Sequence, residues 1–353
     1  MTYRPSRVAV APDLTDSPFV RRILERCQGA DIVTEIPPSG NSETTLLLVR
    51  NPGPYFKPCP ATPEYVCCGY RILNFATGCP LHCTYCILNA YFNDRMLRVF
   101  VDIDRMHCEL DNALRNRRGF LRLGSGEFTD SLALDPLTGF SLDILPRLIK
   151  EKGLLFEFKT KTDNIGNLLR FRPDRRVMVS WSVNTPAMIE REEKGSATLA
   201  ERLSAAAQCA NNGYLVGFHF DPILRHDGWE EGYAAVVDAI YSKIEPDAIA
   251  WISLGCFRFL PSLKSVIQER YPKTPIIYEE FVQGRDGKMR YFRPVRERIY
   301  SLIYERMKKY DPKPPVYLCM ETPRVWEAVF REKKFASETL CARLDKVRDK
   351  YTL

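Results

Sequence analysis

The sequence contains no apolar run of about 18 residues, so it predicts no transmembrane helix. Its N-terminal stretch, MTYRPSRVAVAPDL, lacks the charged head, apolar core and small-residue cleavage site of a secretory signal. Internal repeats and low-complexity tracts are also missing. These absences exclude a membrane-spanning or repeat protein and lead us to expect a globular protein of the cytoplasm.

A strong excess of either charge is missing too. The 353 residues include 51 Lys and Arg against 44 Asp and Glu, a formal net charge of +7. This balance permits an anionic partner such as nucleic acid, but a dedicated DNA-binding domain is usually more basic. The length favours one large α/β domain with extensions, or two domains.

Cysteine, in contrast, is abundant, with twelve residues. In a reducing compartment such cysteines are metal ligands, catalytic thiols or small buried hydrophobes more often than disulfides. Three of them, Cys79, Cys83 and Cys86, fall within the stretch ATGCPLHCTYC with the spacing C-x3-C-x2-C.

Three kinds of site compete for this spacing. A structural zinc site needs a fourth ligand and usually pairs two knuckles, but no second C-x2-C follows in the chain. A disulfide is disfavoured in the cytoplasm. Three thiolates can instead hold three irons of a [4Fe–4S] cluster and leave the fourth iron open. The spacing favours the cluster, with zinc as the alternative.

Strands and helices alternate through the middle of the chain. Six apolar stretches have strand character: residues 70–78, 119–127, 154–162, 176–184, 214–224 and 247–255. Stretches with helical spacing separate most of them, a pattern that indicates parallel strands joined by right-handed crossovers. Six units are fewer than the eight of a complete barrel. We therefore predict a partial (β/α)6 barrel of the TIM type, with an open doubly wound sheet as the alternative.

The flanking segments predict two extensions. Residues 1–64 contain short strands, one helix and a proline-rich connector, and are expected to form an N-terminal α/β extension and linker. We assign residues 65–256 to the partial barrel. Residues 257–353 are expected to form a C-terminal α/β extension that could contact substrate or DNA.

The cysteine motif resembles the signature of the radical S-adenosylmethionine (SAM) enzymes, C-x3-C-x-aromatic-C, in a loop after the first barrel strand. Tyr85 occupies the aromatic position. The resemblance implies a [4Fe–4S] cluster on Cys79, Cys83 and Cys86, with SAM bound at the open iron. Reductive cleavage of SAM would yield a 5′-deoxyadenosyl radical that abstracts a hydrogen atom from the substrate.

The same resemblance places the SAM site at the carboxyl ends of the strands. Gly126 and Glu127, in GSGE, look like the segment that binds the SAM amino group in these enzymes. An ammonium group prefers a carboxylate neighbour, and glycine allows backbone carbonyls to approach closely.

Between about residues 65 and 273 the chain resembles the spore photoproduct lyase family more narrowly. The resemblance rests on FATGCPLHCTYC, FTDSLALDPLTG, FKTKTDNIGNLL, WSVN, GFHFDPILRHDGWEEGY and RYPKTP, in this order. It implies repair of a pyrimidine lesion, by splitting the methylene bridge of a thymine dimer. DNA would then be a partner, together with an electron donor such as flavodoxin or ferredoxin.

Some site residues carry over from that family. Lys161 matches a lysine, and Ser182 a serine, at the SAM carboxylate, while Thr129 matches a serine near the amino group. Tyr85 matches a tyrosine that assists hydrogen return, and packing on the adenine is its alternative role.

Two positions depart from the family. Glu127 stands where the lyases have a cysteine that donates a hydrogen atom, and Ile87 replaces a tyrosine. Because glutamate cannot donate a hydrogen atom, either another thiol takes that role or the chemistry differs. The candidate thiols are Cys67, Cys68 and Cys256, with Cys59 and Cys319 also available. The alternative function is the same radical chemistry on RNA, a peptide or a small molecule.

The stretch GRDGKMRYFRPVRER, residues 284–298, is the best candidate for nucleic-acid contact. Arg290 and Arg293 could position phosphates, and Tyr291 could stack on a base. A solvated start of a basic helix is the alternative.

Overall fold

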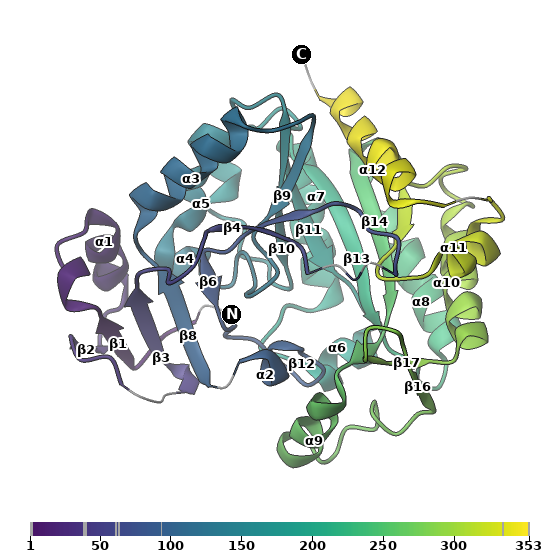
Figure 1. Cartoon of the computed structure of the whole chain (residues 1–353), viewed down its shortest axis with the longest axis horizontal. Coiled ribbons are helices and arrows are strands. Elements are labelled where there is room, and N and C mark those ends of the chain that lie inside the picture. Colours follow the sequence, from purple (N-terminus) through teal and green to yellow (C-terminus); the bar gives the residue numbers. More distant parts are fainter. Residues whose placement is uncertain are drawn as a thin grey trace.

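A curled sheet of eight strands forms the middle of the molecule (Figure 1). The computed structural model describes residues 3–37, 41–60, 62, 64–92, 94–333 and 335–351. The strand order in this sheet is β18-β14-β13-β11-β10-β9-β5-β4. The strands are β4 (Phe56–Pro58), β5 (Arg71–Leu73), β9 (Leu121–Gly124), β10 (Leu154–Thr160), β11 (Val177–Ser182), β13 (Leu215–Ile223), β14 (Ile249–Cys256) and β18 (Val316–Leu318).

The six strands from β5 to β14 are neighbours in chain order and pair in parallel, which confirms the predicted partial barrel. A doubly wound sheet would reverse its strand order at a switch point, and this series does not. Strand β18 extends the sheet in parallel beyond β14, whereas β4 pairs antiparallel with β5. Every residue of β11 and β14 is buried, as expected of parallel strands covered on both faces.

Helices lie around the outside of this curled sheet (Figure 1). Those between barrel strands are α3 (Ile103–Arg115), α4 (Asp135–Thr138), α5 (Phe140–Leu148), α6 (Pro186–Glu192), α7 (Leu199–Asn211) and α8 (Trp229–Tyr241). The start of α7 is fixed by a capping box, in which Thr198 and Glu201 satisfy each other's backbone N–H groups. Near the mouth of the barrel, β7 (His82–Cys83) pairs with β12 (Glu193–Lys194), and α2 (Leu88–Tyr91) follows β7.

A second sheet of five strands carries the N-terminal part, in the order β2-β1-β3-β8-β6. Its elements are β1 (Arg7–Val10), α1 (Pro18–Arg26), β2 (Asp31–Val33), β3 (Asn41–Val49), β6 (Ala76–Thr77) and β8 (Arg95–Phe100). Strand β8 was not predicted from the sequence. Because β6 and β8 lie beyond residue 65, this sheet spans both predicted domains, and the boundary at 64/65 stays a prediction.

The C-terminal part consists of helices around a small antiparallel sheet, β15-β17-β16. Its elements are β15 (Arg258–Phe259), α9 (Pro261–Arg270), β16 (Phe281–Gln283), β17 (Met289–Tyr291), α10 (Arg293–Met307), α11 (Pro323–Phe330) and α12 (Ser337–Asp345). The predicted basic loop is thus mostly a β-hairpin, which leads directly into α10. Within the described residues, none of the helices has the length and apolar character that a membrane crossing requires.

Candidate active site

The three cysteines of the motif lie in one loop that follows β6. Gly78 opens this loop with a φ of +82°, and a Cβ there would lie 2.5 Å from the carbonyl oxygen of Met96. Only glycine fits such a left-handed position against another backbone. Gly78 therefore packs against β8 and is followed directly by Cys79, while Cys83 ends the short strand β7 and Cys86 lies just before α2.

Electrostatic interactions connect the three thiols. Burial is the main cause that raises the pKa of each of Cys79, Cys83 and Cys86. For Cys79, the charges of Asp130, Cys86 and Cys83 raise the pKa further. Thiolates at this place therefore require positive charge nearby, and a bound metal supplies it.

The donor set fits a polynuclear iron–sulfur cluster. The backbone N–H groups of Leu88 and Asn89 hydrogen-bond to the Cys86 thiol, the kind of contact that tunes cluster potentials. No three His, Cys, Asp or Glu side chains in the described ranges converge on a single metal ion. In a cubane each thiolate binds its own iron, so its three cysteines need not converge in that way.

A buried ion pair holds Tyr85 of the cysteine loop in place. The Tyr85 hydroxyl donates a hydrogen bond to the Glu193 carboxylate, which pairs with Arg202 at 2.6 Å. Burial would raise the pKa of Glu193, but Arg202 and Lys161 lower it below its ordinary value. The Arg202 guanidinium also donates to the carbonyl oxygen of Ser182 at 2.8 Å. This network fixes the Tyr85 side chain. Nothing in the sequence pattern predicted Glu193 or Arg202 as part of the site.

The segment after β9 carries a buried hydroxyl that lacks a partner. The Thr129 hydroxyl oxygen is buried, and no described residue forms a hydrogen bond with it. The neighbouring Asp130 carboxylate accepts hydrogen bonds from the Lys161 N–H and the Thr160 hydroxyl, each at 2.7 Å. Asp130 also interacts with Cys79, so it connects this segment to the cysteine loop. An unpaired buried hydroxyl here fits a ligand that supplies the missing partner.

Lys161 provides positive charge between the cysteine loop and the segment that follows β9. Its ammonium lies 5.6 Å from the centre of the Tyr85 ring. Burial would lower the pKa of Lys161, but the charges of Glu193, Cys83 and Cys86 raise it above its ordinary value. Lys161 therefore remains charged at neutral pH, as a lysine that binds a ligand carboxylate must.

The remaining predicted SAM residues lie at the same edge of the sheet. Gly126 packs against Lys159 so closely that a Cβ would lie 2.7 Å from that lysine's Cβ. Ser182 ends β11 and is buried. Glu127 is exposed, and its carboxylate interacts electrostatically with the thiols of Cys59 and Cys319. Two thiols thus lie near the position where the lyase family has its donor cysteine.

The thiols predicted to be catalytic have different surroundings. Cys67 is half-buried, and a hydrogen bond from the Cys68 thiol lowers its pKa to about 6 although burial opposes this. Burial raises the pKa of Cys256, whose backbone N–H donates to the Tyr300 hydroxyl at 2.8 Å. Hydrogen donation by Cys67, Cys68 or Cys256 stays a prediction.

A second polar network crosses the barrel interior, and the sequence pattern did not predict it either. The Glu157 carboxylate accepts hydrogen bonds from Tyr70 at 2.5 Å and interacts with the His219 ring at 2.7 Å. Burial would raise the pKa of Glu157, but His219 and the hydrogen bonds lower it to about 2. The other ring nitrogen of His219 lies 2.5 Å from the Ser253 hydroxyl. These residues lie singly inside apolar strands, where sequence spacing gives no signal.

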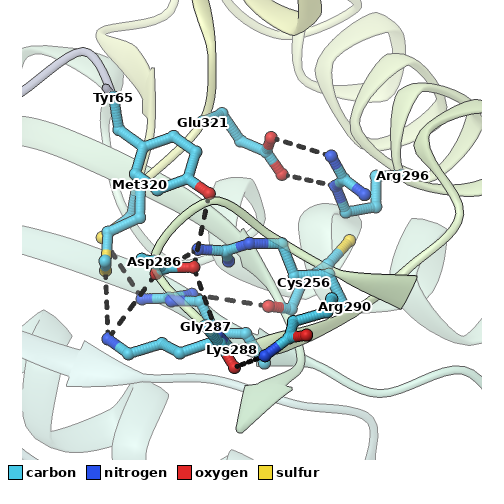
Figure 2. A network of polar contacts seen from close by, with 12 residues as sticks. Tyr65, Cys256, Asp286, Gly287, Lys288, Arg290, Arg296, Met320 and Glu321 are labelled. Carbon is cyan, nitrogen blue, oxygen red and sulfur yellow. Dashed lines mark hydrogen bonds and ion pairs between the residues drawn. The ribbon is translucent and has the colours of Figure 1, made fainter. Parts of the chain in front are cut away.

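Arg290, in the segment predicted to contact nucleic acid, lies inside the protein. Arg290 is 4% exposed, pairs with Asp286 at 2.5 Å and lies over the Tyr65 ring at 4.8 Å (Figure 2). Lys288, on the same hairpin, lies 3.9 Å from the Met320 sulfur. A phosphate could reach Arg290 only by displacing Asp286.

The other two residues of that prediction differ from each other. Tyr291 is buried, and its hydroxyl accepts a hydrogen bond from the backbone N–H of Arg225 at 3.1 Å. Arg293 has a side chain that is 41% exposed and pairs with Glu297 at 3.3 Å. Of the three predicted residues, Arg293 alone presents its charge to solvent, and DNA contact by any of them stays a prediction.

Comparison with known proteins assigns the family. The family model described as spore photoproduct lyase matches residues 64–317. The spore photoproduct lyase of Geobacillus sp. (strain Y412MC61) is 28% identical over 289 residues, which cover 78% of this chain and 81% of that protein. The lyase of Bacillus subtilis (strain 168) is 28% identical over 263 residues, or 71% of this chain and 74% of that protein.

Solved structures agree on the fold. A spore photoproduct lyase variant with bound AdoMet and dinucleoside spore photoproduct superposes with a TM-score of 0.79 at 23% sequence identity. The match covers 90% of this chain and 99% of that one. Nearly the whole architecture is therefore shared, including both extensions of the barrel.

Proposed function

The chain belongs to the spore photoproduct lyase family, and on that premise we propose that it is a radical SAM enzyme acting on a pyrimidine lesion in DNA. The observation that carries this proposal is the cysteine loop. Its three thiols lie within eight residues of the chain, and those of Cys83 and Cys86 interact with the charged Lys161 at the end of a barrel strand. We also propose that the protein works in the cytoplasm.

Cys79, Cys83 and Cys86 would hold a [4Fe–4S] cluster. When bound and reduced, the cluster supplies the electron that cleaves SAM to methionine and a 5′-deoxyadenosyl radical. The chain's own residues position the SAM. Lys161 offers an ammonium for the carboxylate, and the unpaired Thr129 hydroxyl can hydrogen-bond to a polar group of SAM.

The packing around this site fixes one predicted catalytic side chain. Tyr85 is held by Glu193, and the Glu193–Arg202 pair is almost fully buried. Assistance of hydrogen return by Tyr85, or its packing on the adenine of SAM, stays a prediction.

The lesion substrate is supported by the relatives. Both curated lyases align over at least 71% of this chain, and the solved lyase holds a dinucleoside spore photoproduct. We propose DNA containing such a lesion as the substrate. Because Glu127 occupies the position of the donor cysteine, another group in this chain must supply the returned hydrogen atom.

The first test is cofactor assembly and SAM cleavage. Anaerobically reconstituted protein should be brown, hold about four irons and convert SAM to 5′-deoxyadenosine when reduced. The Cys83→Ser variant should lose all three properties. A colourless protein that binds one zinc would contradict the proposal.

A further inference from the structure

The cysteine loop borders a small cavity of about 50 Å³, and Cys79 and Cys86 form part of its wall. None of the predicted SAM residues Gly126, Thr129 and Lys161 lines it. The cavity is therefore an approach to two of the cysteines that those three residues do not share.

The rim of this cavity is basic. Arg95 and Arg270 line it, and both side chains are exposed. The one carboxylate of the lining belongs to Asp94, which pairs with Arg98 at 2.7 Å. The cavity's opening thus has a net positive charge.

One exposed lysine extends this charge. Lys194 pairs directly with His82 across the β7–β12 ladder. Opposite residues of an antiparallel pair share one face, so Lys194 lies on the cavity side, where His82 forms part of the lining. Helix α9, which ends at Arg270, contacts α2, and both lie close to β12 in Figure 1. We call Arg95, Lys194 and Arg270 the basic rim.

The rim lies close to the cysteines. The half-buried Tyr271 lines the same cavity as Arg95, Arg270 and Cys86. Arg270 also donates a hydrogen bond to the Asn89 side chain at 3.3 Å, at the end of the cysteine loop. A partner bound at the rim would therefore lie next to the cysteine loop.

We propose that the basic rim is the docking face for an acidic one-electron carrier protein that reduces the cluster. The inference rests on the proposed function, because it presupposes a cluster on the three cysteines. One electron leaves the reduced carrier and enters the cluster, and no bond is formed or broken.

The charge of the face suits such a partner. Electron-transfer encounters are weak and use small interfaces, below about 1,200 Å². Opposite charge steers the partners together and mainly increases the association rate, by about 10- to 1,000-fold. A DNA duplex is the other anionic partner to consider. The lesion must reach the predicted SAM residues, and none of Gly126, Thr129 and Lys161 lines the cavity at the rim.

The test uses the iron-loaded protein and a photoreduced flavodoxin as the carrier. Stopped-flow absorbance follows cluster reduction at low salt. The Arg95→Glu/Arg270→Glu variant should be reduced at least about tenfold more slowly than the unmodified enzyme, and added salt should shrink the difference. The Arg95→Gln/Arg270→Gln variant keeps a hydrogen-bond donor near Asn89 and should show a smaller loss.

Two controls separate the possible outcomes. Arg118→Glu/Arg324→Glu makes the same change in net charge at exposed sites outside the rim and should leave the rate unchanged. Photoreduced deazaflavin, a small reductant, should reduce all variants equally and support SAM cleavage in all of them.

Equal flavodoxin rates in rim and control variants would overturn the docking face while leaving the proposed function intact. Loss of DNA binding in the rim variants, with an unchanged flavodoxin rate, would assign the rim to nucleic acid and also overturn it. Deazaflavin reduction without SAM cleavage in the unmodified enzyme would instead contradict the proposed function.

Discussion

Lys161 keeps its charge in a place where burial alone would remove it. We predict that Lys161→Met weakens SAM binding by about 10- to 100-fold, because a hydrogen bond to a charged group contributes about 1.5–3 kcal/mol. Isothermal titration of the iron-loaded protein measures this. Lys150→Met, at an exposed position, is the matched control. Unchanged SAM affinity in Lys161→Met would remove this residue from the site.

Glu157 gives a prediction about pH. Its pKa in the folded protein is about 2, below the ordinary 4.5, so its stabilisation is complete above 4.5 and is lost as the pH falls toward 2. Glu157→Gln should therefore cost more stability at pH 7 than at pH 3, by on the order of 1–3 kcal/mol. Urea unfolding of the cluster-free protein measures both, and a cost independent of pH would contradict the assignment.

Residues of the site differed in how well the sequence predicted them. Cys79, Cys83 and Cys86 lie within one short motif, so their spacing indicated their chemistry. Glu193 and Arg202 are separated from Tyr85 by about a hundred residues and meet it only through the fold. No local pattern marks a lone glutamate that follows a helix, such as Glu193, as the partner of a distant tyrosine.

Among the elements, the cysteine loop depends on its first glycine. Gly78→Ala forces a Cβ to within 2.5 Å of the Met96 carbonyl oxygen, at a φ of +82°. We predict a loss of iron binding together with a destabilisation of about 1–3 kcal/mol. Iron analysis and thermal unfolding test this.

Gly119→Ala is the control for that substitution. Gly119 has a φ of +84° but nothing within 4 Å of an added Cβ. The Gly119→Ala variant should therefore lose about 1–2 kcal/mol of stability through backbone strain and retain its iron. Equal iron content in both variants would show that the contact with β8 does not shape the loop.

The β16–β17 hairpin separates two roles that the sequence merged. Arg293→Ala should reduce the slope of log Kd against log salt for DNA by about 0.9 without changing stability, as expected for one phosphate contact. Arg290→Ala should instead destabilise the protein, because it removes the short ion pair of the buried Asp286 carboxylate and leaves it only longer contacts with Lys288 and Tyr65. Fluorescence anisotropy at several salt concentrations, with thermal unfolding, tests both. A salt slope unchanged by Arg293→Ala would exclude that contact.

Strands with long buried apolar runs were predictable, and strands that carry charged residues mostly were not. The barrel strands β10, β11, β13 and β14 are almost entirely buried, so their pattern stood out from the helices between them. Strand β8 and the β15–β17–β16 sheet were missed. Their strands are short or carry arginines, as in RMLRVF and MRY, and tertiary pairing rather than local preference fixes them.

At the scale of the whole molecule, all three parts of the chain hold the cysteine loop. The N-terminal sheet contributes β8, against which Gly78 packs. The barrel contributes Glu193, and the C-terminal part contributes Thr274, whose hydroxyl donates to Glu192 at 2.8 Å. Glu192 in turn accepts a hydrogen bond from Thr84 within the loop at 2.5 Å. Residues of both extensions therefore help to hold the cysteine loop in place.

The most direct measurement is chromatographic analysis of a dinucleoside spore photoproduct after anaerobic incubation with the iron-loaded enzyme, SAM and a reductant. The account predicts that thymidine nucleosides are recovered, that recovery requires SAM, and that Cys83→Ser abolishes it. If the enzyme produces 5′-deoxyadenosine while the photoproduct remains intact, the radical chemistry stands but the lesion is not its substrate, and the central claim is contradicted.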